Sequence, residues 1–277
     1  MTNQNNENLK VSFNDTKTAF SHLSDKDLDF SIKMFQLMQN PTLVKVGTAL
    51  SQFALATHLP ITGIVKATVF RQFCGGTNLT ESLDKVEELY KYNVGSILDY
   101  AVEGAQDEET FESTKNQIIN VIRKAETTEG IPVACMKMTG VFRFELLEKM
   151  TAEAPLNDAE KQEYKRAVDR FEQICKVSHE TGVPIYVDAE ETWIQPAIDR
   201  LVESRMRVYN KKKAIVFHTL QMYRWDKIDH LKKLIAESKK EGWFLGIKFV
   251  RGAYLEKENQ RAKDMGYKTF IQPNKES

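Results

Sequence analysis

The sequence predicts an α/β protein in which a helical arm precedes a parallel sheet. Five apolar runs are each short enough to be a buried strand, and they occupy residues 94–98, 133–138, 183–187, 214–220 and 244–250. Longer segments with apolar residues at helical spacing separate these runs. Strands that alternate with helices form βαβ units, and the right-handed crossovers of such units make the strands parallel.

The first part of the chain, up to about residue 93, contains helical patterns only. We expect helices over about 26–39, 42–57 and 78–92. Asn78 stands three positions before Glu81, which is the spacing of a capping box at the start of the third helix.

The first two helices between the strands have recognisable ends. Asp107 opens a helix that ends near Lys124, so acidic and basic residues complement the helix dipole. Asn157 and Glu160 cap the next helix, and Gly182 stands where a left-handed terminus is expected.

Two further helices are predicted over about 194–209 and 227–241, and Gly242 ends the second. The pattern of strands and helices is compatible with a doubly wound sheet and with an incomplete (β/α)₈ barrel, because both bury their strands on two faces. In both folds the chemistry collects at the carboxyl ends of the strands.

Composition and charge exclude several classes of protein. The 277 residues contain 39 Lys and Arg against 39 Asp and Glu, so the net charge is zero and no nucleic-acid partner is indicated. Three cysteines without a C-x-x-C pair argue against a disulfide framework and a zinc site, and favour a reducing compartment. The first residues lack a secretory or organellar signal and no run is long enough to span a membrane, which predicts a cytoplasmic protein.

Polar residues stand at the carboxyl end of every predicted strand. They are Asp99, Lys137, Asp188 to Glu191, His218 with Gln221, and Lys248 with Arg251. A single residue of this kind is usually a solvated loop residue or a helix cap, and together they could form a structural ion-pair network. The sharper hypothesis is a pocket of mixed charge for a small zwitterion or a cofactor, because Lys137 and Lys248 lie inside apolar runs and an unpaired ammonium in a core is costly.

Six segments at these positions resemble the proline dehydrogenase family, the flavoenzymes that oxidise L-proline. The segments are Arg71–Gly76, Val94–Glu103, Met136–Gly140, Tyr186–Glu191, Thr219–Tyr223 and Lys248–Tyr254. They run in the family's order and cover roughly residues 70–273.

The resemblance implies a (β/α)₈ TIM-like barrel that binds FAD, preceded by an N-terminal helical arm. Residues 1–93 would be the arm and residues 94–277 a partial proline dehydrogenase barrel of about five βα units. The family pattern continues through three more strands and a last helix, so we expect a truncated product or a fragment. The open edges of an incomplete sheet would also favour oligomers.

The resemblance also implies roles for individual residues. Lys137 would meet the carboxylate of proline and Asp188 would shape the substrate pocket, which makes these two the candidate catalytic residues. Gln221 would bind the flavin edge and Lys248 would approach its reactive nitrogen. Arg251, Gly252, Ala253 and Tyr254 would line the cofactor.

The implied reaction is the first step of proline catabolism, the oxidation of L-proline to Δ1-pyrroline-5-carboxylate. The electrons would pass to a quinone, which implies peripheral contact with a membrane, and neither a metal nor a protein nucleophile is required. Two alternatives remain open at this point. One is an inactive remnant that serves as a binding or regulatory module, and the other is a doubly wound small-molecule binding domain.

Overall fold

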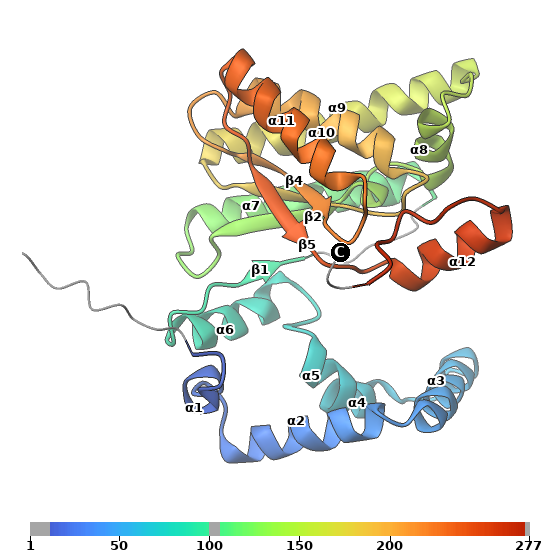
Figure 1. Ribbon diagram of the computed structural model, residues 1–277. Coiled ribbons are helices and arrows are strands. Elements are labelled where there is room, and N and C mark those ends of the chain that lie inside the picture. The colour runs from blue at the N-terminus through green and yellow to red at the C-terminus, as the bar shows by residue number, and fades with distance from the viewer. Residues whose placement is uncertain (1–11, 100–105, 275–277) are drawn as a thin grey trace, which may run out of the picture. The chain divides into compact units, whose positions relative to one another are not determined.

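The computed structural model of the protein describes residues 12–99 and 106–274 (Figure 1). The chain divides into two compact units, residues 1–94 and residues 95–277, and each is described by itself. The predictions that concern the first residues, Tyr100–Glu103 and the last three residues lie outside the described part.

The first unit is helical, as predicted. Its elements are α1 (Thr16–Ala19), α2 (Asp25–Met38), α3 (Pro41–Ala56), α4 (Thr62–Val65), the π-helical turn η1 (Lys66–Phe70), α5 (Arg71–Phe73) and α6 (Leu79–Tyr90). The three helices expected from the sequence are α2, α3 and α6, each displaced by a few residues at most.

The start of α6 differs in one detail from the predicted capping box. The side chain of Asn78 accepts from the backbone N–H of Glu81 at 3.0 Å, as expected. The Glu81 carboxylate instead accepts from the backbone N–H and the hydroxyl of Thr77, at 2.8 and 2.6 Å. Thr77 offers two donors where the cap backbone offers one, so the carboxylate binds outside the box.

The second unit contains one parallel sheet. Its strands are β1 (Ile97–Leu98), β2 (Val133–Lys137), β3 (Ile185–Asp188), β4 (Val216–Gln221) and β5 (Ile247–Val250). They pair in the order β1-β2-β3-β4-β5, so each strand lies beside the next one in the chain. A doubly wound sheet reverses its strand order at a switch point, whereas a barrel adds strands in sequence. The sequential order therefore decides between the two alternatives in favour of the barrel type.

The first strand is shorter than predicted. The run from Val94 was expected to be extended throughout, but the N–H of Val94 bonds to the carbonyl of Leu89 and closes the end of α6. Pairing with β2 begins only at Ile97, which lies opposite Val133.

Helices connect the strands and bury their apolar sides against the sheet. They are α7 (Glu108–Glu126), the 3₁₀ turn η2 (Met138–Gly140), α8 (Phe144–Thr151), α9 (Asp158–Thr181), α10 (Gln195–Tyr209), α11 (Lys227–Glu241) and α12 (Leu255–Met265). The long helices α9, α10 and α11 lie on one side of the sheet (Figure 1). Sequence reasoning missed α8, which has only eight residues. It also missed α12, in which Glu258 and Ala262 alone are buried.

The predicted helix ends of the second unit are confirmed. Asn157 and Glu160 form a complete capping box at α9. Gly182 and Gly242 end α9 and α11 with φ of 73° and 68°, a left-handed conformation that glycine adopts without a steric cost.

The core of the second unit lies between the sheet and these helices. Fully buried side chains come from β3, β4, α9 and α10, and they include Ile185, Val216, Phe171, Ile174 and Ile198. The three cysteines are unpaired, two of them buried. Within the described residues no helix is both long enough and apolar enough to cross a membrane.

Candidate active site at the strand ends

Four residues form one row across the carboxyl ends of neighbouring strands. Lys137 of β2 pairs with Asp188 of β3. Thr219 of β4 pairs with Lys248 of β5. Val187 pairs with His218, which places Asp188 beside Thr219 one residue further along. Residues in register on parallel strands point to the same face of the sheet, so all four side chains leave on one side.

The row opens into a cavity of about 480 Å³. The cavity is lined by Asp99, Lys137, Asp188, Ala189, Thr219, Lys248, Val250, Arg251, Gly252, Ala253 and Tyr254. The resemblance assigns eight residues to the site, and seven of them are in this lining, with Gln221 the exception. Sequence reasoning missed Thr219 and Val250 as lining residues. Two-residue alternation along β4 from Gln221 would have found Thr219.

The cavity is bipolar in charge. Its lining carries the cations Lys137, Lys248 and Arg251 and the carboxylates Asp99 and Asp188. Lys248 and Asp188 form a close ion pair, in which about a quarter of each side chain is exposed. The lining therefore holds one positive charge in excess, and it suits a small ligand that has both a carboxylate and an amine.

The thiol near the row is not a nucleophile. Cys135 lies two residues before Lys137 and so faces the same side of β2. Burial, followed by the charge of Asp188, raises the pKa of the Cys135 thiol to about 12. Since the thiolate is the reactive form, the thiol is inert at neutral pH.

Two residues of the cavity lining, Thr219 and Gly252, have features that bear on ligand binding. The Thr219 hydroxyl is buried and has no hydrogen-bond partner among the residues that the structure describes. Gly252 has φ of 143°, a conformation that side chains rarely adopt, and a Cβ there would lie 3.4 Å from the ring of Tyr223. The backbone conformation at this point of the lining therefore favours glycine over any other residue.

Gln221 is not among the lining residues and is fully buried. Its Nε2 donates to the carbonyl of Glu190 at 2.7 Å, and its Oε1 accepts from Arg224 at 3.1 Å. The structure thus ties the Gln221 amide to the protein, and its predicted contact with a flavin stays a prediction.

Glu190 fastens the end of β3 to the end of β2. Its carboxylate accepts from the backbone N–H of Thr139 at 3.0 Å and from the Thr139 hydroxyl at 2.5 Å. Burial raises the pKa of Glu190 to about 7, although the hydrogen bonds from Thr139 and the charge of Lys137 oppose the rise. A carboxyl group that titrates near neutrality thus adjoins the cavity residues Asp188 and Ala189.

A second glutamate holds α12 in the same way. Glu258 accepts from the backbone N–H of Thr192 at 2.7 Å and from its hydroxyl at 2.6 Å. Since α12 directly follows the segment Arg251–Tyr254, this contact places that segment at the edge of the cavity. No pattern along the chain pairs residues so far apart, so sequence reasoning did not find either contact.

The site lies in a region with a clear family assignment. The family model described as proline dehydrogenase matches residues 82–277, which is more than two thirds of the chain. The chain belongs to the proline dehydrogenase family, and the resemblance seen in the sequence is confirmed.

Curated relatives agree with this assignment. Proline dehydrogenase 1, mitochondrial, of Dictyostelium discoideum is 29% identical over an alignment of 315 residues. The alignment covers 98% of this chain and 54% of the relative. The carbapenem antibiotics biosynthesis protein CarD of Pectobacterium carotovorum subsp. carotovorum is 32% identical over 188 residues, covering 68% of this chain and 50% of CarD. The chain thus spans about half the length of these relatives.

A solved structure shares the fold. Proline utilization A from Bdellovibrio bacteriovorus, inactivated by N-propargylglycine, matches with a TM-score of 0.65 and 17% identity. The match covers 94% of this chain and 28% of that protein. At this identity the likeness concerns the fold, and it agrees with the barrel-type strand order of the second unit.

Proposed function

We propose that the cavity at the strand ends binds L-proline and a flavin, and that the protein oxidises proline to Δ1-pyrroline-5-carboxylate with FAD as cofactor and a quinone as electron acceptor. The observation that carries this proposal is the row of Lys137, Asp188, Thr219 and Lys248 at the mouth of a bipolar cavity. This row lies within the part of the chain that matches the family.

The residues present fit a flavin. The cations Lys248 and Arg251 favour the electron-rich reduced form of such a ring system, and the unpartnered Thr219 hydroxyl offers a hydrogen bond. Gly252, which lines the cavity, has a backbone conformation that glycine adopts without strain. FAD, when bound, would supply the acceptor for the hydride. The hydride leaves the ring carbon that is bonded to the proline nitrogen and does not carry the carboxylate.

The chain's own residues orient the substrate. Lys137 would bind the proline carboxylate through a charge-assisted hydrogen bond. Asp188, held by Lys248, would form the opposite side of the pocket and stabilise the positive charge that develops on the proline nitrogen. Arg251, Ala253 and Tyr254 would line the cofactor.

The colour of the purified protein gives the first test. A yellow protein that retains FAD on gel filtration supports flavin binding. A colourless protein that does not take up added FAD favours the alternative of a binding or regulatory module.

The second test concerns Lys137. We expect Lys137→Ala to lower kcat/KM for proline about 30-fold to 1000-fold with unchanged flavin content, because one charge-assisted contact is worth on the order of 2–4 kcal/mol. Lys213→Ala is the matched control, since the Lys213 ammonium binds the carbonyl of Gly182, at the amino end of β3 and away from the cavity. Unchanged kcat/KM in the Lys137 variant contradicts the assignment.

A further inference from the structure

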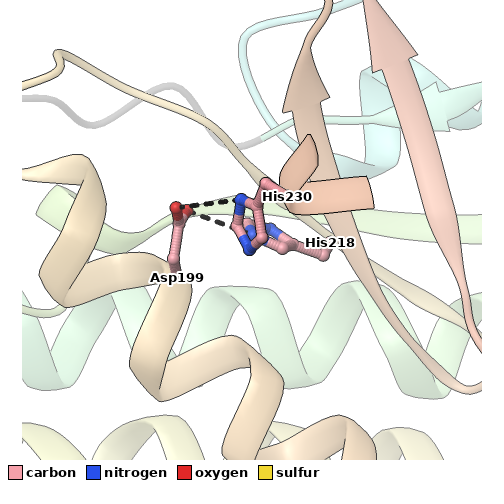
Figure 2. Close-up of side chains that lie close together, drawn as sticks. All are labelled: Asp199, His218 and His230. Atoms are coloured by element: carbon pink, nitrogen blue, oxygen red, sulfur yellow. Dashed lines mark ion pairs between the residues drawn. The ribbon is translucent and has the colours of Figure 1, made fainter. Parts of the chain in front are cut away.

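A buried polar cluster lies behind the sheet, between β4 and the helices α10 and α11. Asp199 on α10 points toward the imidazoles of His218 on β4 and His230 on α11 (Figure 2). Asp199 Oδ1 lies 3.1 Å from His218 Nε2, and Asp199 Oδ2 lies 3.7 Å from His230 Nδ1. Their ligand atoms lie within 4.8 Å of one another, a spacing that could hold a metal ion.

A lysine already supplies a cation to this cluster. The Lys227 ammonium lies 2.9 Å from Asp199 Oδ2 and 3.2 Å from His230 Nδ1, and its side chain is 3% exposed. A metal ion bound to both of these atoms at about 2 Å would have to lie between them, next to the ammonium. The ammonium thus takes the place that a divalent ion would need.

The same contacts define the hydrogen-bond roles of His230. An ammonium can only donate, so His230 Nδ1 accepts and its proton is on Nε2. His230 Nε2 then donates to Glu203 at 2.7 Å. The neutral imidazole of His230 therefore accepts a hydrogen bond from Lys227 and donates one to the carboxylate of Glu203.

Asp199 also determines which way a neighbouring amide faces. Burial alone would raise the pKa of Asp199, but His218 and Lys227 outweigh it and lower the pKa, so the group is an ionised acceptor. Gln195 Nε2 donates to Asp199 Oδ1 at 2.6 Å. The amide oxygen of Gln195 must then face the other way, and it accepts from the backbone N–H of Glu190 at 2.6 Å.

Glu190 connects this arrangement to the cavity. Its N–H is held by Gln195, its carbonyl by Gln221 and its carboxylate by Thr139. Asp188 and Ala189, the two residues before Glu190, line the cavity. A flipped Gln195 amide would point its N–H groups at the N–H of Glu190, and the segment would have to move.

The geometry points to Gln195 as a positioning residue of the active site, whose amide is oriented by Asp199 and by Lys227 acting as an internal cation. The inference rests on the proposed function only in that the ligand of the cavity is taken to be proline. Gln195 itself touches neither ligand and acts through the segment Asp188–Glu190.

The test compares Gln195→Ala with Asn210→Ala in the full chain. Asn210 is a matched buried amide at the other end of β4, where it bonds to Ile215, Val216 and Phe244. NMR measures the hydrogen-exchange rate of the Glu190 amide, which is corrected for the change in global stability of each variant. We expect this rate to rise at least tenfold in Gln195→Ala and to stay unchanged in Asn210→Ala. Because small displacements at a site cost up to about 100-fold in rate, kcat/KM for proline should fall about 10-fold to 100-fold in Gln195→Ala and not in Asn210→Ala.

Equal exchange at Glu190 in both variants overturns the inference, and so does an equal loss of kcat/KM. If the wild type shows no proline turnover, the proposed function fails, and the exchange measurement still decides the role of Gln195. If Gln195→Ala does not fold, Gln195→Met keeps the side-chain volume and gives the same readings.

Titration with Co²⁺ tests whether the Lys227 ammonium excludes a metal ion from the cluster of Asp199, His218 and His230. We expect no visible absorbance band from the wild type, because Lys227 occupies the cluster. Stoichiometric Co²⁺ binding that is lost in His230→Ala would show a metal site and overturn the role given to Lys227.

Discussion

The two units of the protein contrast in what supports their secondary structure. In residues 12–94, the described apolar residues that are buried are Ala54 and Val86, while large apolar side chains such as Phe13, Phe53 and Ile64 are more than half exposed. In residues 95–274, fully buried side chains come from the sheet and from the five helices α7 to α11, and they form a core. Helices of similar length thus occur with and without a core.

The difference shows that capping and helical spacing can define helices where few apolar side chains are buried. The helices α2 and α6 have side-chain caps at Ser24 and Asn78. Such caps contribute about 1 kcal/mol each, whereas burial of one large apolar side chain contributes roughly 1.5–3 kcal/mol. Cooperative stability is therefore expected from the second unit.

Separating the two units should have the largest effect. We expect residues 95–277 alone to unfold in one cooperative transition, and residues 1–94 alone to lose helicity gradually on heating, because an ordered chain needs buried apolar surface to offset its lost entropy. Circular dichroism with calorimetry measures both. A sharp calorimetric transition in residues 1–94 would show that this unit also unfolds cooperatively, contrary to the prediction.

A pair of matched phenylalanines sharpens the comparison. Phe171 on α9 is fully buried, and Phe35 on α2 is 50% exposed. We expect Phe171→Ala to lower the free energy of unfolding by about 3–5 kcal/mol and Phe35→Ala by about 0.5 kcal/mol. Urea titration of the full chain gives both values, and similar losses in the two variants would show that the arm is as well packed as the sheet unit.

Glu190 of the second unit should affect the pH dependence of stability with the opposite sign to the carboxylates of the arm. The folded pKa of Glu190, about 7, lies above its ordinary value of 4.5, so the folded state binds the proton more tightly. Its contribution is complete below pH 4.5 and is lost as the pH rises through 7, roughly 3 kcal/mol in all. We expect Glu190→Gln to remove this slope and Glu126→Gln, at an exposed position, to keep it.

In the arm the corresponding groups are exposed carboxylates. The hydrogen bond from Ser24, with further contributions from Arg71, lowers the pKa of Asp27, and the Thr77 hydroxyl lowers that of Glu81. Helix stabilisation by these groups is present above about pH 4 and is lost as the pH falls below it. An increase in the helicity of residues 1–94 on acidification would contradict this prediction.

The caps should give the smallest effects. Asn157→Ala removes a capping box from α9 and should lower the free energy of unfolding by about 1 kcal/mol, measured in the urea transition. Asn78→Ala removes the cap of α6, and we expect it to lower the helical signal of the arm without shifting the main transition. A shift of the main transition by the full 1 kcal/mol in both variants would mean that α6 unfolds together with the sheet.

Most helices, the five strands and the polar residues at the strand ends could be predicted from the amino-acid sequence. Hydrophobic spacing gave the strands and the longer helices, because burial selects apolar residues at the period of each structure. Lys137 and Lys248 were found because a charge inside an apolar run has few explanations other than a partner or a cavity. Asp188 was found at the end of its strand, and the segment Arg251–Tyr254 was found through the family resemblance. Seven of the eight residues assigned to the site line one cavity.

The contacts between residues far apart in the chain could not be predicted and are seen only in the folded structure. The sequential strand order, the contact of Glu190 with Thr139, and the cluster around Asp199 each join residues from separate elements. Glu190 was noted among the polar residues after the third predicted strand, and Gln195 stands between Ile194 and Pro196, but no local pattern brings these two residues together. Their importance comes from burial, which makes every unpaired donor or acceptor costly and so requires a particular partner across the fold.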